Sequence, residues 1–280
     1  MLIWLGQPAE VAVVGAKSVH LSRLSKHYPV PSGFCLPVAA FTQWMKTDCP
    51  DQLPAPWQSL VEHAYEQLAT TSLTTQPAVA VRSSAVDEDS QNSSFAGQYE
   101  SYLNVRGVEA LYGAILACWR SAFAERVSVY RKSALMLPSY QSLAVLVQQM
   151  VPADLSMVIF SRHPITQQPD VVINAAWGLG QSLVDGSTTP DTYVIRRSDG
   201  AVLKRTIGEK RSMTVQMATG VKQTLTPRPM RNQAVLTETK IQEVTRLTVQ
   251  LETEMGWPVD IEAAYRNDRL YLLQCRPITT

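Results

Sequence analysis

Four polar side chains near the end of the sequence have the spacing of β-strands. Asp260 and Glu262 are two residues apart in one largely apolar stretch. Gln274 and Arg276 are two residues apart in the next stretch. Side chains two apart in a strand share a face, so each stretch is predicted to carry a polar stripe. Two carboxylates facing an amide and a guanidinium could hold a divalent cation and phosphates, whereas the alternative is an ordinary hairpin with a solvated polar face.

The turn between the two stretches decides whether the stripes meet on one face. Residues 267–268 are an Asn-Asp pair, which is typical of a hairpin turn. A two-residue loop would pair Arg266 with Arg269 and would place Glu262 opposite Leu273. In that register the two stripes would lie on opposite faces of the hairpin.

A three-residue loop gives the other parity. A loop over 267–269 pairs Glu262 with Gln274. The same register pairs Asp260 with Arg276, so that the carboxylates lie across from the amide and the guanidinium. We therefore predict a loop with an odd number of residues and a shared polar face.

The composition indicates a large core and no excess of either charge. The chain has 280 residues, of which 45% are hydrophobic, and 25 Lys plus Arg balance 24 Asp plus Glu. This balance argues against nucleic acid or an anionic membrane surface as a partner. The sequence has no apolar run long enough to span a membrane, no basic leader before its first apolar residues, and no Cys-x-x-Cys spacing. We expect a protein of the cytoplasm with reduced cysteines.

Apolar periodicity predicts helices and strands in both halves, with a sheet dominating the second half. A short helix is expected to open at residues 15–18, ahead of the Pro and Gly residues that follow it. The predicted longer helices are 57–68, 108–132 and 236–255, and the predicted strands include 79–84, 102–105, 143–151, 157–161 and 171–175.

Short motifs spread along the chain resemble those of one enzyme family and occur in the family's order. In sequence letters they are GAK at 15–17, VPSGF at 30–34, AVRSSA at 80–85, SFAGQ at 94–98, WGLG at 177–180, PD at 190–191, DIE at 260–262 and QCRP at 274–277. They resemble the nucleotide-binding domain shared by phosphoenolpyruvate synthase, pyruvate, phosphate dikinase and rifampicin phosphotransferase. The resemblance implies an α+β fold of the ATP-grasp type. It further implies a single domain, 1–280, with approximate lobes 1–138 and 139–280, mixed or antiparallel sheets flanked by helices, and a nucleotide site between the lobes.

The resemblance implies ATP and Mg²⁺ as cofactors and assigns roles to charged residues. Asp260 and Glu262 are expected to hold Mg²⁺, which takes few carboxylates and completes its octahedron with water and phosphate oxygens. Lys17 and Arg82 are expected to contact the ATP phosphates, because phosphoryl transfer depends on positioning and on neutralising phosphate charge. The alternatives are a solvated helix residue for Lys17 and a surface salt bridge for Arg82.

The resemblance also implies nucleotide contacts from a loop and from the last strand. Gln274 and Arg276 lie where the family contacts the nucleotide and its phosphates. Gly97 and Gln98 end a small-residue loop, 94–98, whose backbone N–H groups could approach phosphates, although a plain connecting turn is the alternative. The residues expected to be catalytic are Arg82, Glu262 and Arg276.

Two residues depart from the family pattern. Met157 stands where relatives usually carry Gly, and His163 stands where they usually carry an acidic or amide residue. Either change could narrow or retune the nucleotide pocket. The histidine that carries phosphate in the full-length relatives lies in a separate domain with a Thr-Ser-His type motif, so we do not assign that role to His163.

The implied function is that of an ATP- and Mg²⁺-dependent phosphotransferase that splits ATP to AMP. The sequence has no Thr-Ser-His motif and stops at Thr280. The phosphoryl acceptor is therefore expected to be a histidine on a separate carrier protein, or a small molecule. The alternatives are a free-standing kinase or ligase in a biosynthetic pathway and a non-catalytic nucleotide-sensing module, which would not need the metal carboxylates. The sequence leaves open the acceptor, AMP or ADP as the product, the oligomeric state, and whether the chain is a piece of a longer enzyme.

Overall fold

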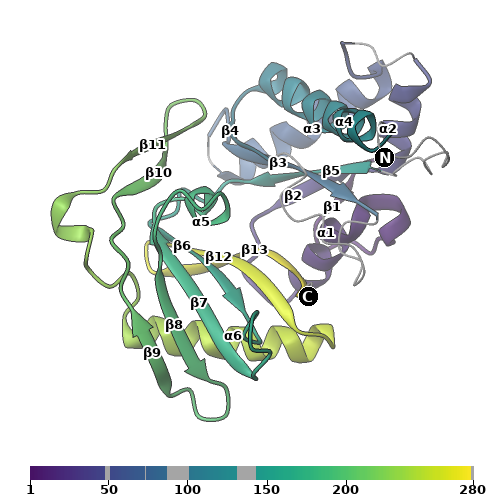
Figure 1. Cartoon of the computed structure of the whole chain (residues 1–280). Helices are drawn as coiled ribbons and strands as arrows, with labels where there is room; N and C mark the ends of the chain where they lie inside the picture. The colour runs from purple at the N-terminus through teal and green to yellow at the C-terminus, as the bar shows by residue number, and fades with distance from the viewer. Residues whose placement is uncertain (48–50, 73, 87–100, 131–142, 279–280) are drawn as a thin grey trace. The chain divides into compact units, whose positions relative to one another are not determined.

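The structure is a computed structural model that describes residues 1–47, 51–72, 74–86, 101–130 and 143–278, with side chains omitted for 122–130. It divides into two compact units, Met1–Met150 and Val151–Thr280 (Figure 1). The sequence predicted the division near residue 138. It falls later because strand β5 (Leu143–Gln149) pairs with strands β2 and β3 of the first unit.

The first unit is built on a five-stranded antiparallel sheet in the order β1-β2-β5-β3-β4. The other strands are β1 (Ile3–Trp4), β2 (Gly33–Leu36), β3 (Val79–Ala85) and β4 (Ser101–Val105). One face packs against α1 (Val11–Leu24), through a small cluster that includes Val14, Cys35 and Ala144. The other face lies under α2 (Val38–Met45), α3 (Ala55–Ser72) and α4 (Val108–Tyr130) (Figure 1). Because helices cover both faces, the middle strand β5 is apolar on both sides from Leu143 to Val147.

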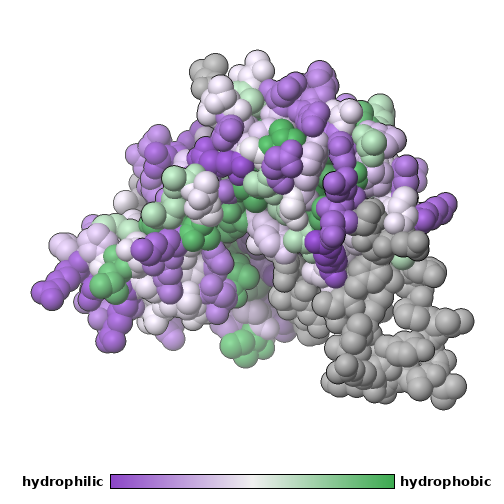
Figure 2. Space-filling view, turned by 90° about the horizontal axis from the view of Figure 1, so that it is seen from above, coloured by the Kyte–Doolittle hydropathy of each residue, from purple (hydrophilic) through white to green (hydrophobic). Residues whose placement is uncertain are grey.

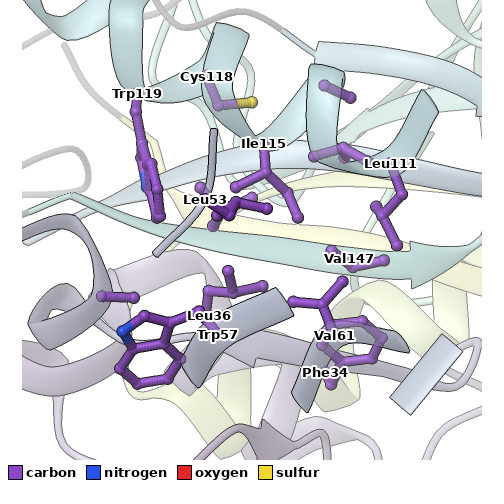
Figure 3. Close-up of a cluster of buried hydrophobic side chains, with 14 of the residues drawn as sticks. Phe34, Leu36, Leu53, Trp57, Val61, Leu111, Ile115, Cys118, Trp119 and Val147 are labelled. Atoms are coloured by element: carbon purple, nitrogen blue, oxygen red, sulfur yellow. The ribbon is translucent and has the colours of Figure 1, made fainter. Parts of the chain in front are cut away.

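The main core of this unit lies between the sheet and helices α2 to α4. Figure 3 shows Leu111, Ile115 and Trp119 of α4 above Val147 of β5, with Phe34 of β2 below. The rings of Trp44 and Trp119 are tilted, with centroids 5.3 Å apart. Each of these side chains is almost completely buried, so truncating a single one should destabilise the unit by about 3 kcal/mol.

The second unit is built on a six-stranded antiparallel sheet in the order β13-β12-β6-β7-β8-β9. The strands are β6 (Leu155–Phe160), β7 (Asp170–Trp177), β8 (Asp191–Arg196), β9 (Val202–Thr206), β12 (Val259–Arg266) and β13 (Arg269–Pro277). The remaining elements are a short helix α5 (Gln181–Val184), a two-stranded hairpin of β10 (Ser212–Gln216) and β11 (Val221–Leu225), the 3-10 turn η1 (Arg228–Met230) and helix α6 (Glu238–Met255).

Helix α6 packs along one face of this sheet (Figure 1). Its start is capped by Thr237, whose side chain accepts a hydrogen bond from the N–H of Lys240, and its end by Gly256 at φ 79°. The apolar stripe of the helix, including Ile241, Val244 and Leu251, is buried. Because α6 covers one face, polar side chains that belong to a site must point to the other.

A buried ion pair joins β8 to the segment that follows β9. Asp191 and Lys210 have fully buried side chains and form a salt bridge. Asp191 also accepts hydrogen bonds from the N–H of Gly208 at 3.0 Å and of Val235 at 2.7 Å, and from the hydroxyl of Tyr193 at 3.2 Å. The Asp191 carboxylate therefore ties β8 to the segments that carry Gly208, Lys210 and Val235.

The predicted α+β class, with antiparallel sheets and flanking helices, is confirmed. On the face shown in Figure 2, hydrophilic residues are interspersed with smaller hydrophobic areas. None of the helices in the described part of the chain has the length and hydropathy needed to cross a bilayer.

Candidate functional site

The turn between β12 and β13 has two residues, so the predicted three-residue loop is wrong. Arg266 pairs with Arg269, and the loop between them consists of Asn267 and Asp268, at φ 48° and 58°. Positive φ at both positions is the geometry of a tight hairpin turn, which Asn and Asp tolerate better than other non-glycine residues. The turn chemistry of this Asn-Asp pair therefore decided the loop length.

A β-bulge nevertheless restores the predicted pairing of the polar residues. The ladder runs regularly as far as Ala263 opposite Leu272, and then shifts so that Glu262 pairs with Gln274. Leu273 is the extra residue, and such a bulge changes the parity of everything beyond it. The same shifted register pairs Asp260 with Arg276. The two polar stripes thus share a face, as predicted, but through a bulge and not through an odd-numbered loop.

Asp260 and Arg276 form an ion pair across the two strands. The Nε and Nη2 atoms of Arg276 donate to Oδ2 of Asp260 at 2.9 and 2.8 Å. Burial raises the pKa of the Asp260 carboxyl; the Arg276 guanidinium opposes this rise, and the nearby Glu262 carboxylate adds to it. The guanidinium thus outweighs the repulsion from Glu262 but does not fully offset the effect of burial on the Asp260 carboxyl.

This arrangement fits a magnesium ion held by Asp260 and Glu262. The mutual repulsion of the two carboxylates is what a divalent cation would relieve, and hard oxygen ligands suit Mg²⁺. Within the described ranges no group of three or more His, Cys, Asp or Glu side chains could hold a metal. Two carboxylates suffice for Mg²⁺ when water and phosphate oxygens complete its coordination.

The face that carries Glu262 continues across the sheet through a polar pair that the sequence analysis missed. Glu262 is opposite Val158 of β6, Val158 is opposite Asn174 of β7, and Asn174 is opposite Thr192 of β8. The Thr192 hydroxyl donates to Oδ1 of Asn174 at 2.8 Å. Strands lie about 4.8 Å apart, so Asn174 is roughly 10 Å from Glu262 along this row. In the sequence, this pair was indicated by the amide Asn174 within the otherwise apolar stretch 171–176.

Met157 does not belong to the polar face. It pairs with Ala263 of β12 and with Ala175 of β7, and successive residues in a strand alternate between faces. Its side chain is 1% exposed, on the face opposite that of Glu262. Met157 is therefore part of the core and does not line the polar face.

His163 lies in the loop between β6 and β7, where it organises the backbone. Its Nδ1 accepts hydrogen bonds from the N–H groups of Ile165 at 3.3 Å and Thr166 at 3.2 Å. Its own backbone N–H donates to the carbonyl of Gln168 at 3.0 Å. An acidic or amide side chain can accept similar backbone bonds, so this histidine can replace such a residue in the loop.

Lys17 and Arg82 come from neighbouring elements of the first unit. Lys17 follows Gly15, which interrupts α1 with φ 75° and ψ 164°, and its side chain is 7% exposed. Its ammonium Nζ lies 3.3 Å from the backbone carbonyl oxygen of Ser83, the residue after Arg82 in β3. Lys17 is therefore not a solvated helix residue, which was the alternative interpretation.

The predicted site residues fall into two groups and one undescribed loop. Lys17 and Arg82 belong to the first unit, while Asp260, Glu262, Gln274 and Arg276 belong to the second, and each group is considered separately. Gly97 and Gln98 lie outside the described residues.

Comparisons with known proteins identify a family and several relatives. Residues 49–280 match the family described as pyruvate phosphate dikinase, AMP/ATP-binding domain. The chain is 34% identical over 279 residues to an uncharacterized phosphotransferase, YvkC, of Bacillus subtilis (strain 168), covering 96% of this chain and 34% of that protein. It is 34% identical over 288 residues to the prodigiosin synthesizing transferase PigC of Serratia marcescens, covering 95% of this chain and 32% of that protein.

An archaeal protein is similarly related. A probable phosphoenolpyruvate synthase of Methanothermobacter thermautotrophicus is 32% identical over 305 residues, covering 97% of this chain and 44% of that protein. The chain thus spans less than half the length of these three relatives. The family match covers most of the chain and includes the β12–β13 hairpin, and the protein therefore belongs to the pyruvate phosphate dikinase AMP/ATP-binding domain family.

Proposed function

We propose that the chain is the ATP-binding and ATP-cleaving component of a dikinase-like phosphotransferase that uses ATP and Mg²⁺. The observation that carries the proposal is the pairing of Asp260 with Arg276 and of Glu262 with Gln274 on one face of the hairpin. Membership of the AMP/ATP-binding domain family supports ATP as the nucleotide. Two carboxylates facing a guanidinium and an amide suit a metal-bound polyphosphate better than an uncharged ligand.

The roles that we propose for the site residues follow from their charges. Asp260 and Glu262 would hold Mg²⁺, and a bound Mg²⁺ would neutralise developing charge on the phosphate oxygens. Arg276 is able to bind phosphate oxygens through two N–H groups, while its present partner Asp260 keeps the guanidinium oriented. Lys17 and Arg82 would neutralise further phosphate charge from the first unit, with Gly97, Gln98 and Gln274 as nucleotide contacts. Catalysis would then be mainly electrostatic, with Arg82, Glu262 and Arg276 as its main residues.

For the acceptor, we propose a histidine on a carrier protein or on a further part of a longer chain. The length of the relatives supports this proposal, since the matched region is only 34% of YvkC and 44% of the archaeal protein. Moving the β-phosphoryl group to such a histidine would leave AMP, and the γ-phosphate would be released to water as inorganic phosphate. No nucleic acid partner is proposed, because the charge balance of the sequence gives no attraction to one.

The relationship to PigC favours a second candidate function. PigC is named as a prodigiosin synthesizing transferase, which supports direct action on a small molecule in a biosynthetic pathway. A free-standing kinase or ligase of this kind would form AMP or ADP with a small acceptor alone.

We also propose the cytoplasm as the location of the protein. The described cysteines, Cys35, Cys118 and Cys275, are free thiols, which suits a reducing compartment.

The test is to incubate the purified protein with ATP, Mg²⁺ and candidate acceptors and to separate the nucleotides by chromatography. Glu262→Gln should lower turnover by about a hundredfold or more, because it removes a metal ligand while keeping the side-chain shape. Glu243→Gln is the matched control, since Glu243 accepts the Tyr265 hydroxyl at 2.7 Å and Tyr265 is near Glu262 in β12. Wild-type rates in Glu262→Gln, or no ATP uptake by the wild type in calorimetry, would contradict the proposal.

A parallel pair of variants tests the first unit. Arg82→Ala should also abolish turnover, because it removes a cation from the phosphates. Arg120→Ala removes an arginine of the same unit whose exposed ion pair with Asp51 is worth at most about 1 kcal/mol. This control should keep wild-type activity, and equal loss in both variants would instead indicate a general loss of folding.

A further inference from the structure

A serine side chain bridges a missing main-chain hydrogen bond in helix α1. In an unbroken helix, the N–H of Ser18 would bond to the carbonyl of Val14, four residues earlier. The non-helical backbone of Gly15 prevents this hydrogen bond. The hydroxyl of Ser84, from β3, bridges the two groups by accepting from the N–H of Ser18 at 3.2 Å and donating to the carbonyl of Val14 at 2.9 Å. A side chain inserted in this way is an established cause of a sharp helix kink.

The contact between the kink and β3 is too close for any side chain at residue 15. A Cβ atom on Gly15 would lie 2.1 Å from the backbone oxygen of Ser84 and 2.4 Å from its Oγ. The hydroxyl of Ser18 lies 3.2 Å from Oγ of Ser84 and 3.4 Å from Sγ of Cys35, and its single hydrogen can be donated to either atom. Ser84 is completely buried, so bulk water has no access to replace its hydroxyl.

Lys17 lies between the two residues that this hydroxyl joins. The Ser84 hydroxyl bridges Val14 and Ser18, and Lys17 is the residue before Ser18. Its Nζ lies 3.3 Å from the carbonyl oxygen of Ser83, the residue before Ser84. The direction of the Lys17 side chain therefore depends on the kink, and the kink depends on the inserted hydroxyl.

We propose that Ser84 is a positioning residue that sets the Lys17 ammonium beside the carbonyl of Ser83, the residue after Arg82 in β3. This inference rests on the proposed function for its link to ATP, while the placement of Lys17 can be tested without ATP. Removing the hydroxyl leaves two possibilities. In the first, the N–H of Ser18 bonds directly to the carbonyl of Val14, and Lys17 rotates with the helix. In the second, these two groups stay buried without the hydroxyl as a partner. The first outcome moves Lys17 from its present position, and the second weakens the kink that holds Lys17 there.

The first experiment measures Lys17 in the ligand-free protein. Acetic anhydride is applied for a short time, and mass spectrometry reports the rate of acetylation at Lys17. Ser84→Ala should raise this rate by about tenfold, which corresponds to the loss of about 1.4 kcal/mol of protection. Ser84→Thr keeps the hydroxyl and should restore a rate close to that of the wild type.

Ser22→Ala provides the matched control. Ser22 is also a buried serine of α1, and its Oγ donates to the carbonyl of Gln7 at 2.7 Å and accepts from the N–H of Gly6 at 2.9 Å. The variant also loses a bond donated to a backbone carbonyl and one accepted from a backbone N–H, but it leaves the kink intact. Acetylation of Lys17 should stay at the wild-type rate in Ser22→Ala. Unchanged acetylation in Ser84→Ala, or an equal rise in Ser22→Ala, would overturn the positioning role.

The second experiment connects the kink to ATP. Ser84→Ala should raise the KM for ATP by about tenfold with a smaller change in kcat, because a phosphate contact is weakened in ground and transition state alike. A purely structural loss would lower the amount of active protein and hence kcat, with KM unchanged. If the wild type takes up no ATP, the proposed function fails, while the acetylation experiment still decides the role of Ser84.

Discussion

The kink of α1 and the β12–β13 hairpin both position charged side chains, but they do so over very different distances in the sequence. At the kink, Ser84 bonds to Val14 and Ser18, 70 and 66 residues earlier in the chain. In the hairpin, Asp260 and Arg276 are 16 residues apart and meet because adjacent strands pair. Strand periodicity is a local property that can be read from spacing, whereas the kink depends on a contact between distant segments. The hairpin should therefore tolerate local changes that the kink cannot.

The largest effect is expected from Gly15→Ala at the kink. The substitution adds a Cβ 2.1 Å from the Ser84 carbonyl oxygen and requires a non-glycine residue at φ 75°. The clash and the unfavourable backbone together should lower the free energy of unfolding by about 3–5 kcal/mol in urea titrations. Gly186→Ala is the control, since Gly186 has φ 69° and no atom within 4 Å of an added Cβ.

The control separates the two causes of this loss. Gly186→Ala should cost only the backbone term, about 1–2 kcal/mol. Equal losses in the two variants would show that the close approach of β3 to the kink contributes nothing, and the contrast between kink and hairpin would lose its basis.

A smaller effect is expected on the titration of Asp260 in the hairpin. The Glu262 carboxylate raises the pKa of Asp260 and the Arg276 guanidinium lowers it. Glu262→Gln should therefore move the titration midpoint of the Asp260 carboxyl carbon, followed by NMR, to lower pH, and Arg276→Ala should move it to higher pH. Glu243→Gln should leave the midpoint where it is. Movement in the opposite sense in either site variant would show that the pairs do not face each other.

The raised pKa of Asp260 also has a consequence for stability. The folded protein binds this proton more readily than the unfolded chain does, so the contribution of Asp260 to stability falls as pH rises through its folded pKa. Above that pH the ionised carboxylate costs stability but is ready to bind Mg²⁺. Such a cost to the fold is expected at a functional position, and it agrees with the proposed role of Asp260 as a metal ligand.

The smallest effect is expected from deleting Leu273. Leu273 is the extra residue of the bulge. Without it, Gln274 would come directly after Leu272, so the ladder would be regular and Glu262 would still pair with Gln274. The deletion should therefore keep the polar face, with only a small loss of stability, while Leu273→Ala keeps the bulge itself. Cross-strand NMR contacts between residues 262 and 274 provide the measurement. Their loss in the deletion variant would show that the twist of the bulge, and not only its parity, holds the site together.

Much of the fold could be predicted from periodicity. The helix predicted at 108–132 is Val108–Tyr130, and the strand predicted at 79–84 is Val79–Ala85. Long apolar repeats predict such elements well because burial of one face drives their formation. Asn174 was missed because a single amide in an apolar strand gives no indication of the side to which it points until the neighbouring strands are placed.

Local spacing specified the polar stripes at Asp260 and Arg276, since alternation within a strand is a property of the backbone. The turn at Asn267 and the bulge at Leu273 were left to the folded sheet, because loop length and parity can compensate for each other and one spacing fits both solutions. The surroundings of Lys17 could not be anticipated at all. They depend on Ser84 entering a helix from a strand that lies far away in the chain, and such a contact exists only once the core has packed.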